Sequence, residues 1–540
     1  MKHLTLALFA LLALCACGGG GGGSSTPTFT IGGTVSGLTS GTLVLKNNNG
    51  DDLTINANST SFTFATALAS GAAYAVTSGT QPSGLACDVT NNTGTIASAN
   101  VTGITITCTA PVYAVNPIGV NNNSYTVSGS VSGLTSGTLV LKNNNGDDLT
   151  INANSTSFTF ATALASGAAY VVTAGSQPSG LACVVANNTG TIASANVSGV
   201  TIKCITPVYV TNELSNTISM YAINTTTGIL TALTTPNVAT GNGNAPQTIV
   251  VNPAGTFAYV TSMQSNTVSM YAINSTTGIL TALTTPTVAT GKKPISITIN
   301  PAGTFAYVTN NDGNTVSMYA INSTTGILTA LTTPTVATGS QPVSITVNPA
   351  GTFAYVVNSL GGNVSMYSIN ATSGILTPLT TPTVTAGSSP LTIAVNPLGT
   401  FAYVVNEGSN TISMYSINAT TGILTPLTIS TLATEGQCQL IVISPAGTFA
   451  YVTSIDNNAV SMYAINATTG ILTPLKTPTV ATGTRPNWIA FNRAGTFAYV
   501  TNETSNTVSM YAVNATTGIL TPLTTPTVAT GTAPYGIAFK

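Results

Sequence analysis

The sequence contains very little charge. Of its 540 residues only 4% are Asp, Glu, Lys or Arg, whereas an average soluble protein has roughly 25%. The formal net charge of −1 offers nothing that would attract nucleic acid or an anionic membrane surface. Solubility must come from threonine, asparagine, serine and glycine, a composition that favours strands and turns over helices.

Histidine is almost absent. The sole histidine is His3, which lies in a segment that we expect to be cleaved. The remaining chain therefore has no histidine for a catalytic triad and no imidazole metal ligand. We expect neither a bound metal nor a cofactor.

The amino terminus lacks an apolar run long enough to span a bilayer. "MKHLTLALFALLALCAC" has a short basic start followed by a short apolar stretch, which is typical of a signal peptide. Its end resembles a bacterial lipobox, with Cys17 as the acylated residue and "CGGGGGGSS" as a flexible tether. We predict a signal peptide over residues 1–16, a tether over 17–28, and an outer-membrane lipoprotein that faces the periplasm or the cell surface. An ordinary secretory signal is the alternative.

Two copies of one module follow. "SGLTSGTLVLKNNNGDDLTINANSTSFTFATALASGAAY" occurs at Ser36 and again at Ser132. Short alternating runs separated by turn residues, with "NNNGDD" as a hairpin signal, predict antiparallel strands. We predict β-sandwich modules over residues 29–112 and 125–207, joined by a linker over 113–124.

Each module carries two cysteines with the same spacing. In an exported chain this pattern favours disulfides Cys87–Cys108 and Cys183–Cys204, and two cysteines without histidine make an incomplete zinc site. The paired aspartates at 51–52 and 147–148 are candidate Ca²⁺ ligands. No bidentate glutamate follows them, so we interpret them as solvated turn carboxylates.

The rest of the chain is a tandem repeat. "YVTN" or a near variant recurs at intervals of 48 to 50 residues, at Tyr209, Tyr259, Tyr307, Tyr355, Tyr403, Tyr451 and Tyr499. A full unit reads "ISITINPAGTFAYVTNNDGNTVSMYAINSTTGILTALTTPTVATG" and contains four strand patterns, A to D. Seven such units over residues 208–540 predict a seven-bladed β-propeller.

The motif "NPAGTFAYVTN…NTVSMYAIN" resembles the YVTN-repeat surface propellers and the lactonase-like seven-bladed family that includes bacterial 6-phosphogluconolactonase. The resemblance implies an all-β propeller fold and, as an activity, lactone hydrolysis.

The phase of the repeats predicts how the ring closes. The first unit begins at strand B, "PVYVTN", and its strand A is supplied by "PYGIAF" at residues 534–539. Three strands from the start and one from the end would form one blade and remove the open edges.

Strand C carries a methionine in every unit. A methionine ring would suit a soft metal, but strand C lies away from the central channel. We therefore predict core residues between blades, as we do for the tyrosine that follows each methionine. The methionines are Met220, Met270, Met318, Met366, Met414, Met462 and Met510.

Differences between the seven units collect in two sets of loops, which a four-stranded blade places on one face. The B–C loops carry Glu213, Met263, Asp312, Leu360, Glu407, Asp456 and Glu503. The D–A connections carry Lys292, Lys293, Glu435, Cys438, Arg485 and Asn487, with Trp488 beginning strand A.

Two interpretations of this face stay open: loop positions that are free to drift, and a recognition surface. On the second, Trp488, Arg485 and Asn487 with Tyr535 beside them would bind a protein or a polysaccharide. The only free cysteine of the propeller, Cys438, replaces a proline found in the other six units, and we interpret it as a partly buried thiol without a base to activate it.

A lactonase needs an acid or base and a group that stabilises the oxyanion. The candidate cations are Lys292, Lys293, Arg485 and Arg493, and the candidate carboxylates are spread over different blades. Our first hypothesis is a non-enzymatic, monomeric lipoprotein that presents one propeller face to a partner. A lactonase-like hydrolase on the same face is the alternative, and a purely structural envelope protein is a third.

Overall fold

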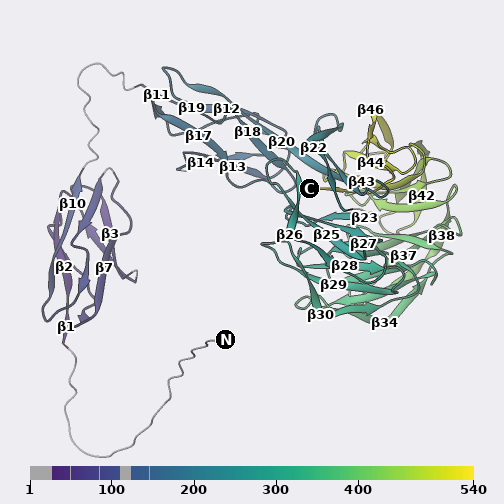
Figure 1. Ribbon diagram of the computed structural model, residues 1–540, viewed down its shortest axis with the longest axis horizontal. Coiled ribbons are helices and arrows are strands. Elements are labelled where there is room, and N and C mark those ends of the chain that lie inside the picture. The colour runs from purple at the N-terminus through teal and green to yellow at the C-terminus, as the bar shows by residue number, and fades with distance from the viewer. Residues whose placement is uncertain (1–26, 49, 84, 110–122, 145, 242) are drawn as a thin grey trace, which may run out of the picture. The chain divides into compact units, whose positions relative to one another are not determined.

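The computed structural model describes residues 27–48, 50–83, 85–109, 123–144, 146–241 and 243–540 (Figure 1). These residues form strands, turns and bends, and no helix among them is long and apolar enough to cross a membrane. The predicted signal peptide, Cys17 and most of the tether and the linker lie outside the described residues. The chain divides into two compact units, Met1–Asn121 and Asn122–Lys540.

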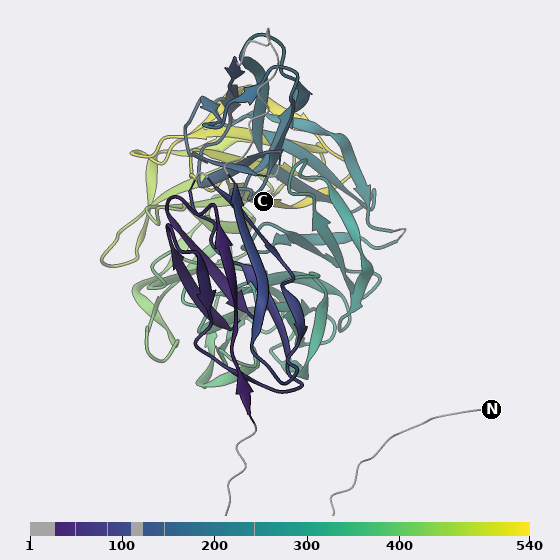
Figure 2. The same cartoon turned by 90° about the vertical axis from the view of Figure 1, so that its left-hand side faces the viewer.

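The first unit contains two four-stranded sheets that share one core (Figure 2). One sheet has the order β5-β2-β10-β8 and the other the order β4-β3-β7-β9. Ile31 and Ile106 from the first sheet meet Leu43 and Leu45 from the second, and all four are fully buried. The strands are β1 (Thr28–Phe29), β2 (Ile31–Ser36), β3 (Thr42–Asn47), β4 (Asp51–Asn56), β5 (Ser61–Thr63), β6 (Leu68–Ala69), β7 (Ala73–Ser78), β8 (Ala86–Thr90), β9 (Thr93–Thr95) and β10 (Val101–Thr109).

The second unit begins with a repeat of this arrangement and continues into the propeller. The strands of its module are β11 (Ser124–Tyr125), β12 (Val127–Ser132), β13 (Thr138–Asn143), β14 (Asp147–Asn152), β15 (Ser157–Thr159), β16 (Leu164–Ala165), β17 (Ala169–Ala174), β18 (Ala182–Ala186), β19 (Thr189–Thr191) and the first half of β20 (Val197–Asn212).

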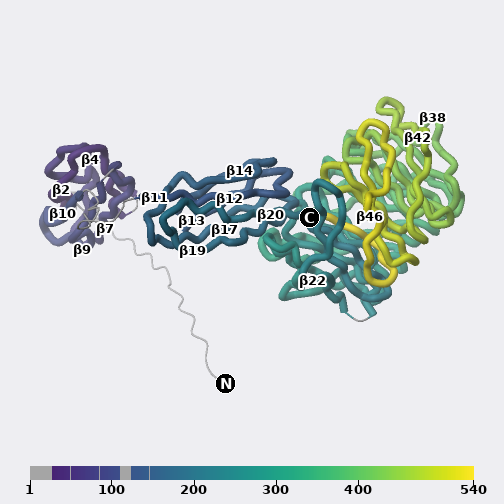
Figure 3. Tube along the Cα trace, turned by 90° about the horizontal axis from the view of Figure 1, so that it is seen from above, coloured from purple at the N-terminus to yellow at the C-terminus, as the bar shows by residue number. Residues whose placement is uncertain are grey.

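Strand β20 belongs to the module and to the propeller at once (Figure 3). Its first half pairs with β12 and β18, as at Val131↔Ile202 and Cys183↔Cys204. Its second half pairs with two propeller strands, β21 and β47. The boundary predicted between residues 207 and 208 falls inside this continuous strand.

Both predicted disulfides are formed, each between cysteines that face each other on paired strands. Gln81 holds the first pair by bonding both the N–H and the C=O of Cys87, at 2.9 and 3.0 Å. Two of the four turn aspartates expected to be solvated make exposed ion pairs: Lys46 with Asp52 at 2.7 Å and Lys142 with Asp148 at 2.6 Å. Asp51, by contrast, has one buried carboxylate oxygen.

The propeller has seven blades of four strands each, as the repeat predicts. Six of them are separate four-stranded sheets, and the strands of blade 1 belong to a seven-stranded sheet that continues through β20 into the second module. The A strands begin with proline in six blades, where its missing N–H costs no ladder hydrogen bond. Blade 1 comprises β47 (Pro534–Phe539), β20, β21 (Thr217–Ile223) and β22 (Leu230–Ala239); blade 2 comprises β23 (Pro246–Val251), β24 (Phe257–Ser262), β25 (Thr267–Ile273) and β26 (Leu280–Ala289). Blade 3 comprises β27 (Pro294–Ile299), β28 (Phe305–Asn310), β29 (Thr315–Ile321) and β30 (Leu328–Ala337); blade 4 comprises β31 (Pro342–Val347), β32 (Phe353–Asn358), β33 (Asn363–Ile369) and β34 (Leu376–Thr385). Blade 5 comprises β35 (Pro390–Val395), β36 (Phe401–Asn406), β37 (Thr411–Ile417) and β38 (Leu424–Ala433); blade 6 comprises β39 (Cys438–Ile443), β40 (Phe449–Ser454), β41 (Ala459–Ile465) and β42 (Leu472–Ala481). Blade 7 comprises β43 (Pro486–Phe491), β44 (Phe497–Asn502), β45 (Thr507–Val513) and β46 (Leu520–Ala529).

The ring closes through the predicted exchange of strands. β47 pairs antiparallel with β20, as at Tyr209↔Ala538 and Val210↔Ile537. Gly536 donates its N–H to Thr211 Oγ1 at 2.8 Å, which adds a side-chain bond to this ladder. Blade 1 therefore contains three strands from the start of the propeller sequence and one from its end.

Neighbouring blades are joined by the tyrosines and methionines of the repeat. Each B-strand tyrosine is fully buried and donates its hydroxyl to a glycine carbonyl in the C–D turn of the next blade, from Tyr209 with Gly278 to Tyr499 with Gly228 across the closure. The strand C methionines are also fully buried, and Met220 Sδ accepts the N–H of Leu280 from blade 2 at 3.4 Å. Both residue types are interblade core, as predicted.

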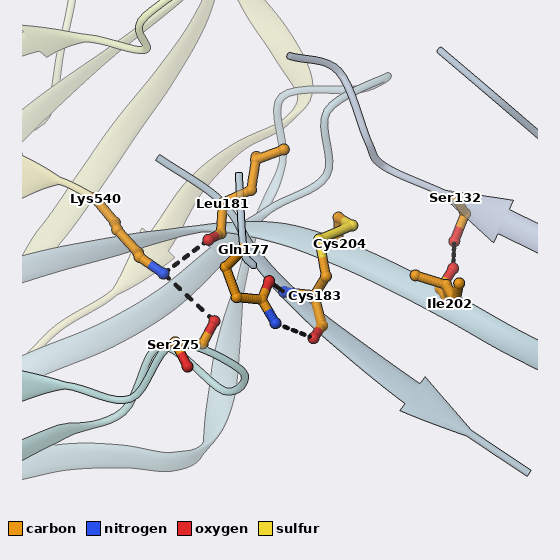
Figure 4. Close-up of a disulfide and its surroundings, with 8 residues drawn as sticks. All are labelled: Ser132, Gln177, Leu181, Cys183, Ile202, Cys204, Ser275 and Lys540. Carbon is orange, nitrogen blue, oxygen red and sulfur yellow. Dashed lines mark hydrogen bonds between the residues drawn. A yellow bond between two sulfur atoms is a disulfide. The ribbon is translucent and has the colours of Figure 1, made fainter. Parts of the chain in front are cut away.

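The second module also contacts the propeller beside its C-terminal residue (Figure 4). Lys540 Nζ donates to the carbonyls of Leu181 at 2.7 Å and Ser275 at 3.4 Å. Burial lowers the pKa of Lys540 to about 8. Arg493, which the sequence analysis named among the candidate cations of a lactonase, donates to Ser179 Oγ at 3.3 Å and so belongs to this junction.

Candidate functional site

The central channel is lined by the A strands. Its volume is about 490 Å³. The third residue of the A strand contributes to this lining in blades 2 to 7: Thr248, Ser296, Ser344 and Thr392 on blades 2 to 5, then Leu440 and Trp488 on blades 6 and 7. The described residues that line the channel include no charged side chain.

The backbone fixes the loops that surround the mouth of this channel. Arg485 takes a left-handed φ of 56° immediately before the proline that starts β43. Its N–H donates to Asn458 Oδ1 of blade 6 at 2.8 Å, and its carbonyl accepts the N–H of Glu503 at 2.9 Å. Equivalent bonds recur at Lys293, which bonds Asn266 and Asn311. The D–A and B–C loops are therefore tied together on one face.

Blades 7, 1 and 2 bring a set of polar and aromatic side chains together at the mouth. β47 lies against two B strands: Thr501 Oγ1 donates to the carbonyl of Tyr535 at 2.7 Å, and the N–H of Glu213 donates to the carbonyl of Ala533 at 2.9 Å. Glu503 and Glu213 directly follow those two B strands, and the charges of both act on Tyr535. We use the name mouth cluster for Glu213, Gln247, Arg485, Asn487, Trp488, Glu503 and Tyr535.

Hydrogen bonds and ring contacts hold the mouth cluster. Asn487 Nδ2 donates to Glu503 Oε2 at 3.3 Å, and Arg485 Nε lies 3.5 Å from the same oxygen. The rings of Trp488 and Tyr535 pack with their centroids 6.1 Å apart. Both rings are half-buried, so part of the pair stays exposed.

The two carboxylates influence the titration of their neighbours. Burial raises the pKa of Glu213 above its usual value; the Gln247 hydrogen bond opposes this, and the charge of Glu503 adds to it. Burial raises the pKa of Tyr535 to about 12, and the charges of Glu213 and Glu503 contribute. A carboxyl group with a raised pKa is suited to proton transfer near neutral pH.

The remaining predicted residues lie outside the mouth cluster. Lys293 and Asp312 form an exposed ion pair at 2.9 Å, and Lys292 and Asp456 are exposed. Glu407 accepts a hydrogen bond from Gln439 at 3.0 Å on blades 5 and 6.

Cys438 is completely buried, which corrects the expectation of a partly buried thiol. Burial is the main cause that raises its pKa. The thiol therefore stays protonated in the core and is unsuited to nucleophilic chemistry.

Sequence reasoning missed Gln247 and Gln439. Both occupy the second position of strand A, which is Ile295, Val343 and Leu391 in blades 3 to 5 and polar or aromatic in the other four. A comparison of the repeats at this position would have found the change. The residue at this position is apolar in blades 3 to 5 and polar or aromatic in blades 6, 7, 1 and 2. The position therefore distinguishes an apolar half of the mouth from the half that holds the mouth cluster.

Fold and site together define a seven-bladed propeller with polar groups at one channel mouth. The family described as "Lactonase, 7-bladed beta-propeller" matches residues 204–343, 235–389 and 334–534. These overlapping segments cover more than half of the chain, from strand β20 to the last D strand. The chain belongs to this family.

Solved structures share the propeller fold at low identity. A 6-phosphogluconolactonase candidate from Bacteroides fragilis is 20% identical with a TM-score of 0.55, over 62% of this chain and 98% of that one. The periplasmic gluconolactonase of Pseudomonas aeruginosa is 18% identical with a TM-score of 0.53, over 62% and 99%. A protein from Lactobacillus plantarum is 21% identical with a TM-score of 0.54, over 62% and 99%. No curated protein matches the chain.

Proposed function

We propose that the chain is a lactonase-type hydrolase that opens a lactone ring at the mouth cluster. The observation that carries the proposal is the pair of carboxylates, Glu213 and Glu503, whose charges both contribute to the raised pKa of Tyr535. Membership of the lactonase propeller family supports it. The alternative of our sequence analysis thereby takes precedence over a purely non-enzymatic role.

In the proposed reaction Glu213 is the general base. It takes a proton from a water molecule whose oxygen attacks the lactone carbonyl, and the carbonyl π electrons move to oxygen. The Tyr535 hydroxyl, kept protonated by its raised pKa, and the Asn487 amide are the donors that would stabilise this oxyanion. The ring C–O bond then breaks, and the proton held by Glu213 passes to the leaving oxygen.

The other members of the mouth cluster position the substrate. Trp488 and Tyr535 offer an apolar surface against which a flat lactone ring can pack. Arg485 holds Glu503 in place, and Gln247 does the same for Glu213.

Hydrolysis of sugar lactones by the purified chain tests the proposal. We expect Glu213→Gln to lower kcat by 10²-fold or more, since a positioned base contributes about 10² to 10⁴-fold. Glu435→Gln is the matched control, because Glu435 is an exposed carboxylate on the same face. No turnover by the unmodified chain, or equal rates for Glu213→Gln, would contradict the assignment.

Ligand binding without turnover is a second candidate, favoured by the half-buried Trp488–Tyr535 pair. Such rings dominate recognition surfaces for proteins and polymers. A saturable ligand that Trp488→Ala weakens and that the chain leaves intact would establish this role. Chains that neither bind nor hydrolyse would favour the structural alternative.

We also propose export and anchoring through a lipid on Cys17. The support is the lipobox-like "LCAC" ending at that residue and the glycine tether that follows. Labelled palmitate should be incorporated by the unmodified chain and not by Cys17→Ser. Label that survives the substitution would rule out this anchor.

A further inference from the structure

We infer that the mouth cluster selects uncharged lactones and excludes phosphorylated ones. The inference rests on the proposed function, which supplies the class of ligand, a lactone. It concerns the binding of that ligand at the mouth and not its turnover.

Carboxylates occupy one equivalent position on three blades. Glu213, Glu407 and Glu503 each directly follow a B strand. Their hydrogen-bond partners at the mouth are the neutral amides of Gln247, Gln439 and Asn487. An amide satisfies an oxygen atom without compensating its negative charge. Glu503 also pairs with Arg485, so the anionic groups that the mouth presents to an entering ligand are chiefly Glu213 and Glu407.

The cations of this face do not neutralise its negative charge. Lys293 is paired with Asp312, and Arg485 lies 3.5 Å from Glu503. Six carboxylates of the variable loops (Glu213, Asp312, Glu407, Glu435, Asp456 and Glu503) face three cations (Lys292, Lys293 and Arg485), a net charge of −3. A phosphate dianion that approaches this face is repelled.

The channel below the mouth offers a phosphate no partner either. Its lining consists of hydroxyls such as Thr248 and Ser296 and of apolar groups such as Leu440, with no charged side chain among the described lining residues. A dianion placed there would lose water without gaining a cation. Hydroxyls of an uncharged sugar, by contrast, can bond the serine and threonine side chains.

The chain carries its own reporter for the test. Trp488 is its single tryptophan and belongs to the mouth cluster, so fluorescence follows binding without requiring turnover. The probes are D-glucono-δ-lactone and its 6-phosphate, added to the full chain at low ionic strength. We expect the neutral lactone to change the emission and the phosphorylated one to bind at least tenfold more weakly.

A charge variant outside the mouth cluster sharpens the result. Glu407→Gln removes one negative charge from the variable face. We expect this change to reduce the difference in affinity between the two probes severalfold, and added salt should have the same effect. Asp148→Asn in the second module removes one charge elsewhere and should leave the difference unchanged.

The outcomes separate the inference from the proposed function. Selective binding of the neutral probe without hydrolysis would end the lactonase proposal and support the inference. Hydrolysis together with equal or tighter binding of the phosphorylated probe would support the lactonase proposal and overturn the inference. An emission that neither probe changes would overturn the inference at this site.

Discussion

At the scale of single residues, one hydroxyl recurs as the link between blades. Tyr355 is fully buried, and its hydroxyl donates to the Gly422 carbonyl of the next blade at 2.8 Å. The same bond appears at all seven B-strand tyrosines, including the pair Tyr499–Gly228 that crosses the closure. Removing it leaves a buried carbonyl without its partner.

Tyr355→Phe should therefore lower the free energy of unfolding of the propeller by about 1–2 kcal/mol, the cost of an unmade buried hydrogen bond. Denaturant unfolding measures the change. Tyr74→Phe, in the other compact unit, is the control and should leave the propeller transition where it is. An unshifted midpoint for Tyr355→Phe would mean that the bond contributes nothing.

At the scale of elements, one pair of strands closes the ring. Its members are β47, the last strand of the propeller, and β20, the strand that leads from the second module into blade 1. β47 fills the position of strand A in blade 1 and bonds β20 along its length. Without β47, β20 would expose an unpaired edge next to the channel, and such edges promote aggregation.

Deletion of residues 532–540 should produce a protease-sensitive, aggregation-prone chain. The deletion also removes Tyr535 from the mouth cluster and the Lys540 contact with Leu181. Limited proteolysis and the Tm measure the loss. Deletion of residues 27–121, a separate compact unit, is the control. Equal Tm and protease resistance for the truncated chain would refute closure by β47.

The second disulfide joins β18 to the strand that continues into blade 1. Cys183 and Cys204 are 21 residues apart, and a loop of that size contributes about 3 kcal/mol in the chain-entropy model. We expect Cys183→Ala with Cys204→Ala to lower the stability of the module by about this amount. Cys87→Ala with Cys108→Ala is the matched pair and should affect only the first module. Calorimetry with separate transitions distinguishes the two.

At the scale of the whole molecule, the buried tyrosines make stability depend on alkaline pH. Burial raises the pKa values of the B-strand tyrosines above 10.0, and it raises those of Tyr271, Tyr319, Tyr463 and Tyr511 to about 12. The folded state therefore holds protons that the unfolded state loses above pH 10.

The stabilisation is complete below pH 10 and is lost as the pH rises toward the folded pKa values. Each such tyrosine costs about 1.4 kcal/mol per pH unit in that interval. We expect a cooperative alkaline transition of the propeller between about pH 10 and pH 12, followed by circular dichroism. A propeller unfolding midpoint in denaturant that does not move between pH 9 and pH 11 would show that these hydroxyls titrate freely.

Identical sequences acquire different surroundings in the two modules. "QPSGLAC" occurs at residues 81–87 and 177–183. In the second copy Leu181 and Ala182 are buried beside the propeller, whereas Leu85 is half-exposed and Ala86 exposed in the first. The difference comes from the neighbours that β20 and Lys540 provide, which local sequence does not encode.

The candidate site was predictable in its place and not in its membership. Internal comparison of the repeats predicted the variable face and named Glu213, Trp488, Glu503 and Tyr535. It could not say that these four converge while Asp312, Glu407 and Asp456 do not, because convergence depends on which blades are adjacent across the closure. Gln247 was missed because its role, a hydrogen bond to the Glu213 side chain, becomes visible only when the fold places the two residues side by side.

The sequence alone determined the seven blades, the strand exchange in blade 1 and the two disulfides. Those features follow from periodic patterns of hydrophobic, turn and cysteine residues, which act over short distances and repeat. Only the tertiary structure decided that β20 unites the second module with the propeller, that Cys438 is fully buried, and that the charges of Glu213 and Glu503 both act on Tyr535. Those facts depend on contacts between residues far apart in the sequence, such as Thr211 with Gly536, which are 325 positions apart. Such contacts exist only once the ring has closed.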